Sequence, residues 1–371
     1  MKISEIRVYR KELHYARGAY AWGRGNVIES GSSTIVVIET DSGLSGCGEF
    51  CPCGNNYMVA HQEGTEAALK LLGPALIGMN PCETAKIGYR MDQCLRGHGY
   101  AKAALDAACW DLLGKATEQP LWLLLGGKFF DGAPMYRPAP QKRPDEMAEE
   151  MNWLRDQGYR QFQIKVGGDW ETDIERIRST VSLLQSGEKA FADANQGWHL
   201  DEALQVANAT RDLDYVMEQP CQTYEECLQL RQRIDTPMKL DECVDSLAMA
   251  QRVVADRAAE YVCCKISNLG GLSKARIVRD YLVANRIPII GEDTWGGEIT
   301  TATLAHFAAS TPDEFLVNTT DLHSYNIETT GTPAPRTENG LLFADDRPGH
   351  GVEPDFDSLG DPVALYQASL I

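Results

Sequence analysis

The sequence predicts an α/β protein in which a parallel β/α barrel follows an α+β module. From about residue 133 onward, short apolar runs alternate with amphipathic helical segments through eight units, whereas the first third shows no such rhythm. Five consecutive runs end in an ionisable residue. A doubly wound open sheet is the alternative arrangement, but the regular spacing and the reactive residues on so many consecutive strands favour the closed barrel.

The N-terminal module is expected to span residues 1–130. Strands are predicted at 2–12 and 34–40, and the second is followed by the hairpin turn signal Asp41-Ser42-Gly43. Helices are predicted at 60–77, 81–95 and 99–116. The last helix carries small and apolar residues at helical spacing, so we expect it to be buried.

The barrel is expected to span residues 131–330, with one strand in each unit. The strands are centred on 135–137, 162–165, 190–193, 215–218, 238–241, 261–265, 288–291 and 315–318. Amphipathic helices fill the gaps, for example Asp145–Gln157, Trp170–Ser186 and Asp201–Ala209. Residues 331–371 begin with a Pro- and Gly-rich stretch, and we expect this C-terminal segment to fold back on the N-terminal module.

Composition narrows the class of protein. The chain of 371 residues has a formal net charge of −18, which argues against partners such as nucleic acid or an anionic membrane and favours a site that recruits a cation. No apolar stretch reaches membrane-spanning length, and the N-terminus lacks a signal-peptide core, so a cytoplasmic location is expected. The eleven cysteines are scattered, as in a protein with reduced thiols.

Three carboxylates stand at the ends of consecutive predicted strands: Asp193, Glu218 and Asp241. Neighbouring strands lie about 4.8 Å apart, so these groups would repel one another unless a cation lay between them. A ligand set made only of oxygen suits a hard cation, Mg²⁺ first and Mn²⁺ second. The alternative is that the three cap helices or pair with surface bases.

Two lysines bracket these carboxylates, Lys165 on the second strand and Lys265 on the sixth. In a barrel these strands lie on opposite sides of the mouth. A buried lysine beside a metal can act as a base near neutral pH. One lysine could therefore remove the α-proton of a bound carboxylate substrate, giving an enediolate. The other could return a proton from the opposite face or help a β-leaving group depart.

The motifs around these residues resemble the mandelate racemase/muconate lactonizing enzyme branch of the enolase superfamily. They are Ile164-Lys165-Val166-Gly167-Gly168-Asp169, Asp193-Ala194-Asn195-Gln196-Gly197-Trp198, Glu218-Gln219-Pro220, Leu240-Asp241-Glu242, Lys265-Ile266-Ser267-Asn268-Leu269-Gly270-Gly271-Leu272 and the stretch Tyr100–Gly127.

This resemblance implies a modified, TIM-like (β/α) barrel with an α+β capping domain made of the N-terminal module and the C-terminal segment. It also implies Mg²⁺ on the three carboxylates, acid/base roles for the two lysines, and a homo-oligomer, either a dimer or an octamer. A non-catalytic metal-binding barrel is a remote alternative, because it predicts the loss of at least one of the five residues and none is missing.

One position departs from the family pattern. The family often has Lys-x-Lys on the second strand, whereas this chain reads Gln163-Ile164-Lys165. Lys165 therefore lacks a cationic neighbour at that position. The metal must supply more of the electrostatic effect, or Lys265 must carry the first proton transfer.

Substrate specificity is expected in two loops, Tyr15–Asn26 and Phe50–His61, and at the ends of the last two strands. The candidate substrate-binding residues are Tyr57, Trp295, Asp293, Asp321, Asn195 and Gln163. Aromatic and acidic side chains around a pocket suit a cationic nitrogen.

Three stretches are similar to members that act on proline derivatives: Glu49-Phe50-Cys51-Pro52, Asn56-Tyr57 and Asp293-Thr294-Trp295-Gly296-Gly297. This similarity implies dehydration of cis-3-hydroxy-L-proline or a similar cyclic amino acid. The alternative is 2-epimerisation or racemisation of proline betaine, hydroxyproline betaine or another N-substituted amino acid. Dehydration of a sugar acid is disfavoured, because Glu292-Asp293 has no histidine nearby.

Overall fold

The computed structural model describes residues 1–368 and contains a parallel eight-stranded barrel at its centre. In spatial order the strands are β7 (Tyr136–Ala139), β8 (Gln161–Lys165), β9 (Lys189–Asp193), β10 (Val216–Glu218), β11 (Met238–Leu240), β12 (Tyr261–Lys265), β13 (Ile289–Glu292) and β14 (Leu316–Thr319). A parallel bridge between Met135 and Thr319 nearly closes the ring. The predicted fold class is confirmed, and the open-sheet alternative is wrong.

The register of the strands brings their carboxyl ends to one level. Lys165 lies opposite Asp193 in the β8–β9 pair, and Asp193 lies opposite Glu218 in the β9–β10 pair. Because parallel strands in register end at the same edge, side chains far apart in sequence meet at the barrel mouth.

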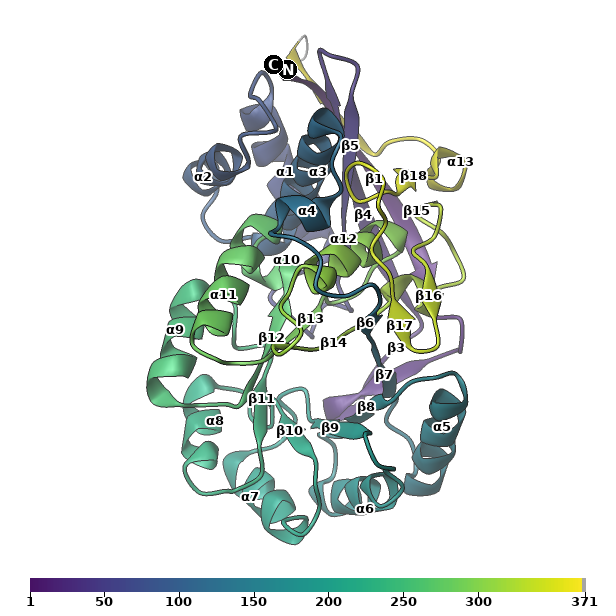
Figure 1. Cartoon of the computed structure of the whole chain (residues 1–371), viewed down its shortest axis with the longest axis vertical. Coiled ribbons are helices and arrows are strands. Elements are labelled where there is room, and N and C mark those ends of the chain that lie inside the picture. The colour runs from purple at the N-terminus through teal and green to yellow at the C-terminus, as the bar shows by residue number, and fades with distance from the viewer. Residues whose placement is uncertain (369–371) are drawn as a thin grey trace.

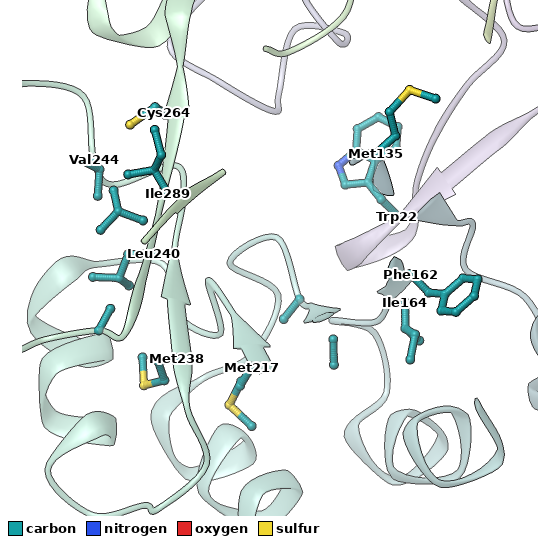
Figure 2. Close-up of a cluster of buried hydrophobic side chains, with 14 of the residues drawn as sticks. Trp22, Met135, Phe162, Ile164, Met217, Met238, Leu240, Val244, Cys264 and Ile289 are labelled. Carbon is teal, nitrogen blue, oxygen red and sulfur yellow. The ribbon is translucent and has the colours of Figure 1, made fainter. Parts of the chain in front are cut away.

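Alternation along each strand separates the helix-facing core from the barrel interior. On β8, Phe162 and Ile164 are buried on the outer side, whereas Gln163 and Lys165 face inward. Figure 2 shows the outward set, with Phe162, Ile164 and Met217 lying between strands and helices. Each apolar side chain of this size contributes about 1.5–3 kcal/mol when fully buried.

The barrel helices follow their strands and cover the outer face (Figure 1). They are α5 (Pro144–Asp156), α6 (Trp170–Val181), α7 (Leu200–Ala209), α8 (Tyr224–Arg231), α9 (Leu247–Asp256), α10 (Ile266–Leu269), α11 (Leu272–Ala284) and α12 (Glu298–Ala309). Side-chain caps fix where several begin: Asp169 accepts from the Thr172 amide of α6, and Ser246 accepts from the Met249 amide of α9. All residues of α12 are buried, because it packs between the barrel and the capping elements.

The capping elements combine an antiparallel sheet with three helices. The sheet has the order β19 (Ala364–Gln367), β1 (Ile3–His14), β4 (Ser30–Thr40) and β5 (Ser45–Phe50), and the helices are α1 (Gln62–Leu76), α2 (Thr84–Cys94) and α3 (Gly99–Thr117). Strand β19 pairs with β1, and Figure 1 shows the yellow C-terminal segment beside the purple N-terminal strands. The last three residues of the predicted 331–371 segment lie outside the described residues.

Helix α3 is buried on all sides, as its small residues predict. It lies against β5 so closely that a Cβ atom at Gly48 would come within 2.0 Å of the Ala104 carbonyl oxygen. The glycine is therefore needed for this contact rather than for its backbone angles.

Shorter elements complete the chain. They are β2 (Tyr20–Trp22), η1 (Gly23–Gly25), β3 (Asn26–Ile28), α4 (Leu121–Leu124), β6 (Ala133–Pro134), η2 (Leu322–Tyr325), β15 (Gly331–Thr332), β16 (Thr337–Glu338), β17 (Leu341–Leu342), β18 (Glu353–Pro354) and α13 (Phe356–Leu359). Strand β2 and the first residue of β3 fall within the loop Tyr15–Asn26, which is expected to carry specificity. Within residues 1–368, none of the helices has the length and apolar character needed to cross a membrane.

Candidate active site

Three carboxylates at the barrel mouth are each paired with a different buried lysine. Lys165 Nζ lies 2.5 Å from Asp193 Oδ2, and Lys239 Nζ lies 2.6 Å from Glu218 Oε1. Lys265 pairs with Asp241 Oδ2. All six side chains are at most 8% exposed, so these ion pairs are screened little by water.

The hydrogen-bonded network around the three lysines contains more carboxyl groups than amino groups. It contains five carboxylates, Asp193, Glu218, Asp241, Glu242 and Glu292, against Lys165, Lys239 and Lys265. When all five carboxyl groups are ionised, the excess of two negative charges equals the charge of one divalent cation.

Unsatisfied oxygens mark where such a cation would fit. Glu218 Oε2, Asp241 Oδ1 and Glu242 Oε2 are buried and have no hydrogen-bond partner among the described residues. Burial, and then repulsion from Asp193, raises the pKa of Glu218 to about 8. Buried oxygens left without partners are costly, and an all-oxygen donor set is typical of Mg²⁺ sites. The residues present therefore fit a hard divalent cation.

Lys165 ends β8 and is held by two groups. Besides Asp193, its amine donates to Asn195 Oδ1 at 3.1 Å. Burial opposes the positive charge, but attraction to Asp193 outweighs it and raises the pKa of Lys165. Asn195 in turn donates to Glu242 Oε1 at 2.9 Å, so it connects this lysine to the carboxylate that follows Asp241.

Lys265 ends β12 and is contacted by more side chains than Lys165 is. Its amine lies 2.5 Å from Glu292 Oε1 and 3.8 Å from Cys263 Sγ, in addition to its contact with Asp241. The ring of Tyr57, from the loop after β5, lies 5.6 Å above it. Burial again opposes the charge, but attraction to Asp241 leads the contributions that raise the pKa of Lys265.

Gln163 contacts a carboxylate rather than Lys165. Its Nε2 donates to Glu218 Oε1 at 3.0 Å, the same oxygen that Lys239 holds. Both donors therefore fix one oxygen of Glu218 and leave Oε2 free. Lys239 supplies the positive charge that Gln163 lacks, but from the fifth strand of the barrel.

A pocket lies above this charged floor. Much of its lining is aromatic: Tyr20, Trp22, Tyr57, Tyr136, Trp295 and Tyr325. The ring centroid of Trp295 lies 5.7 Å from that of Tyr20 and 5.6 Å from that of Tyr325. Lys165, Gln163, Asn195, Glu292 and Asp293 also line it.

Two capping segments are fixed over the mouth. A Cβ atom at Gly23 would come within 2.4 Å of the Ala194 carbonyl oxygen, so only glycine allows η1 to approach the end of β9 this closely. The loop after β5 is joined to the end of β13, because Cys51 forms an antiparallel bridge with Trp295 and the Thr294 hydroxyl donates to the Cys51 carbonyl at 2.7 Å. The charged floor of the pocket thus comes from the barrel and its roof from the capping elements.

Comparison with known protein families identifies this arrangement. Residues 24–126 match the mandelate racemase/muconate lactonizing enzyme N-terminal domain, and residues 146–358 match the enolase C-terminal domain-like family. The chain belongs to the mandelate racemase/muconate lactonizing enzyme branch of the enolase superfamily.

Individual members of this branch resemble the chain over nearly its whole length. The cis-3-hydroxy-L-proline dehydratase of Roseibium aggregatum is 46% identical over 99% of this chain and 100% of its own. A mandelate racemase/muconate lactonizing enzyme from Roseovarius nubinhibens ISM has 59% identity and a TM-score of 0.96, covering 99% of this chain and 98% of its own. A second structure from that organism, complexed with magnesium, has 34% identity and a TM-score of 0.95 over 99% and 100% of the two chains.

The structure brings together most residues that the sequence nominated for this branch of enzymes. The two lysines and three carboxylates meet at the mouth, and Tyr57, Trp295, Asp293, Asn195 and Gln163 line the cavity. Asp293 is held by the Ser267 amide at 3.0 Å and the Thr294 amide at 2.8 Å, and burial raises its pKa to about 6. Asp321 is not among the cavity-lining residues; it is buried and forms an ion pair with Arg137 at 3.2 Å.

Sequence reasoning missed four residues of this network: Lys239, Glu242, Glu292 and Tyr136. Lys239 lies two positions before Asp241, so strand alternation alone places it on the same inner face. Glu242 directly follows a nominated ligand. Glu292 ends β13 and lies opposite Lys265 in the β12–β13 pair, so the strand-end pattern could have found it. Tyr136 begins β7 and carries no such signal.

Proposed function

We propose that this protein is a Mg²⁺-dependent dehydratase of cis-3-hydroxy-L-proline or a similar cyclic amino acid. The single observation that carries the proposal is the position of the two lysines. Lys165 ends β8 and Lys265 ends β12, four strands apart in the eight-stranded barrel, so their amines approach the site from opposite sides. The 46% identity with the Roseibium dehydratase supports the choice of substrate.

Asp193, Glu218 and Asp241 are the proposed ligands of the divalent cation, with Mn²⁺ as a possible substitute. When bound, the cation would supply positive charge beside the substrate carboxylate, where negative charge grows as the α-proton leaves. Glu242 is a further candidate ligand, because its Oε2 is one of the unsatisfied buried oxygens and its Oε1 accepts from Asn195, which also contacts Lys165.

The stereochemistry of the substrate matches two opposed lysines. In cis-3-hydroxy-L-proline the hydroxyl group is on the same ring face as the carboxylate, so the α-hydrogen is on the other face. One lysine takes the α-proton as the C2–H bond breaks and the C2=C3 bond forms. The other lysine protonates the departing 3-hydroxyl as the C3–O bond breaks, releasing water and an enamine. General acid and base on opposite faces thus serve an anti elimination.

The cavity lining suits a small ring with a cationic nitrogen. Tyr20, Trp295 and Tyr325 form adjoining aromatic faces, which attract a cation and pack against the pyrrolidine carbons. Asp293 adds negative charge beside them, although its oxygens already accept from Ser267 and Thr294.

The second candidate function is 2-epimerisation of an N-substituted proline. The same two lysines favour it, because a proton removed by one can be returned by the other on the opposite face. The two reactions share their first step and differ only in whether a leaving group stands at C3.

Incubation with Mg²⁺ in D₂O, followed by NMR and mass spectrometry, tests these functions. Loss of water from cis-3-hydroxy-L-proline is the expected result, whereas deuterium at Cα with the substituents retained would assign the epimerase. Lys165→Ala and Lys265→Ala should each abolish dehydration. If no proline derivative exchanges or reacts, the proposed substrate class is wrong.

Assembly into a dimer or octamer and a cytoplasmic location stay predictions from the resemblance and the composition. Multi-angle light scattering on the purified protein tests the first, and fractionation of the source cells tests the second.

A further inference from the structure

Glu292, at the end of β13, is a buried carboxylate whose two oxygens are both occupied by protein groups. Oε1 accepts from Lys265 Nζ at 2.5 Å. Oε2 accepts from the Tyr136 hydroxyl at 2.7 Å and lies 3.6 Å from Lys239 Nζ. Glu292 is 4% exposed. It is therefore held from two sides by β7 and β11 and holds the lysine that ends β12.

The surroundings of Lys265 explain a cluster that otherwise looks like a second metal site. One oxygen of Asp241, the Cys263 sulfur and one oxygen of Glu292 lie within 4.8 Å of one another, a grouping that could hold an ion. The Lys265 amine contacts all three of these residues, so an ammonium group already fills the space between them. The cluster is thus the binding site of the Lys265 amine rather than a metal site.

The two lysines differ in what would remain to hold them once the cation is bound. Each contacts one proposed ligand, Lys165 through Asp193 and Lys265 through Asp241. Beyond that ligand, Lys165 has only the neutral side chain of Asn195 among its hydrogen-bond partners in the described residues, whereas Lys265 has the carboxylate of Glu292.

We infer that Glu292 is the positioning residue of Lys265, with Tyr136 and Lys239 fixing its orientation. This inference rests on the proposed function. Glu292 sets the location of the Lys265 amine against the reacting carbon, and the amine alone exchanges a proton with the substrate. A carboxylate anchored on both oxygens fixes the amine more narrowly than a rotating side chain could.

The test is a set of three substitutions assayed for dehydration at saturating Mg²⁺. Glu292→Gln keeps the shape of the side chain and removes its charge. Glu292→Asp keeps the charge, but its shorter side chain moves the carboxylate away from the Lys265 amine. Tyr136→Phe removes only the hydroxyl that anchors Oε2. Partners of this kind typically change activity about 10- to 100-fold. We expect kcat to fall by that factor in Glu292→Gln and by less in the other two, with KM and the Kd for Mn²⁺ little changed.

Glu188→Gln is the matched control. Glu188 is a buried carboxylate paired with Arg155 at 2.7 Å, just before β9 and so at the end of the barrel away from the mouth. The kcat of Glu188→Gln should equal that of the wild type. A crystal structure of Mg²⁺-loaded Glu292→Gln should show the Lys265 amine displaced from its wild-type location.

Three results would overturn the inference. They are an unchanged kcat in Glu292→Gln, a fall in kcat/KM caused only by a higher KM, and a rise in the Kd for Mn²⁺ large enough to account for the lost activity. Should Glu292→Gln fail to fold, Glu292→Asp and Tyr136→Phe decide by the same criteria. The proposed function fails separately, and is recognised by full activity of Lys265→Ala or by no reaction of the wild type.

Discussion

Acidification should destabilise the fold through His306, a fully buried histidine of α12. Its Nδ1 accepts from the Trp122 amide at 3.0 Å, and its Nε2 lies 3.2 Å from the His350 carbonyl. Both bonds are made by the neutral ring with its proton on Nε2. Burial, reinforced by His350, lowers the pKa of His306 from 6.5 to about 4.

The sign follows from which state binds the proton more tightly. The unfolded chain takes up this proton at its ordinary pKa of about 6.5, whereas the folded chain resists protonation down to about 4. The contribution of His306 to stability is therefore complete above pH 6.5 and is lost as the pH falls toward 4. Linkage gives a loss of about 2 kcal/mol between pH 7.5 and pH 5 from this residue alone.

The assay is urea unfolding at pH 7.5, 6 and 5, followed by tryptophan fluorescence. His306→Gln cannot titrate, so its stability should fall with pH by about 2 kcal/mol less than that of the wild type. His61→Gln, at an exposed position before α1, should keep the wild-type dependence. Equal pH dependence of wild type and His306→Gln would refute the reasoning, whatever their stabilities at pH 7.5.

Three further predictions concern the metal, the substrate pocket and the packing of the cap. Glu218→Gln should weaken Mn²⁺ binding, measured by electron paramagnetic resonance, by at least about tenfold, and an unchanged Kd would remove Glu218 from the ligand set. Trp295→Leu should raise KM for the cyclic substrate about tenfold and alter kcat less, since a desolvated cation–π contact contributes about 1–2 kcal/mol; a loss in kcat alone would contradict binding through this ring. Gly48→Ala should lower stability by about 1–3 kcal/mol or more, because the new methyl group meets the Ala104 carbonyl oxygen. In thermal unfolding Gly48→Ala should melt at a lower temperature than Gly88→Ala, whose methyl group meets nothing within 4 Å. Equal melting temperatures would show that β5 and α3 can move apart without loss of stability.

Much of the barrel could be predicted because its signals are local. Strands such as β8 and β12 are short apolar runs that end in a charged residue, and the chain repeats this pattern at nearly even spacing. The five nominated residues follow from the same pattern, since parallel strand ends must meet. Their assembly at one mouth required no knowledge of contacts between particular side chains.

The remaining parts depend on contacts that no local pattern encodes. The β2–β3 hairpin lies where Gly23 fits against the Ala194 carbonyl, and this contact joins segments about 170 residues apart in sequence. Asp321 and Glu292 both end barrel strands or follow them closely, yet Asp321 is paired with Arg137 and does not line the cavity, whereas Glu292 lines it. Sequence position alone does not distinguish these two outcomes.

Lys239 shows how the charged floor can fold at all. Several carboxylates this deep in a barrel would destabilise it by desolvation and mutual repulsion. Each nominated ligand instead has its own ammonium partner, and for Glu218 that partner is a lysine outside the proposed acid/base pair. Lys165 and Lys265 are then available for proton transfer with the substrate, while Lys239 stays between Glu218 and Glu292. Glu218 therefore has a cationic partner although position 163 is Gln, because Lys239 on β11 contacts the same oxygen that Gln163 contacts. A Lys239→Met variant should therefore lose more activity than Gln163→Ala, and regain part of it when combined with Gln163→Lys; a combined variant no better than Lys239→Met would show that the two positions are not equivalent.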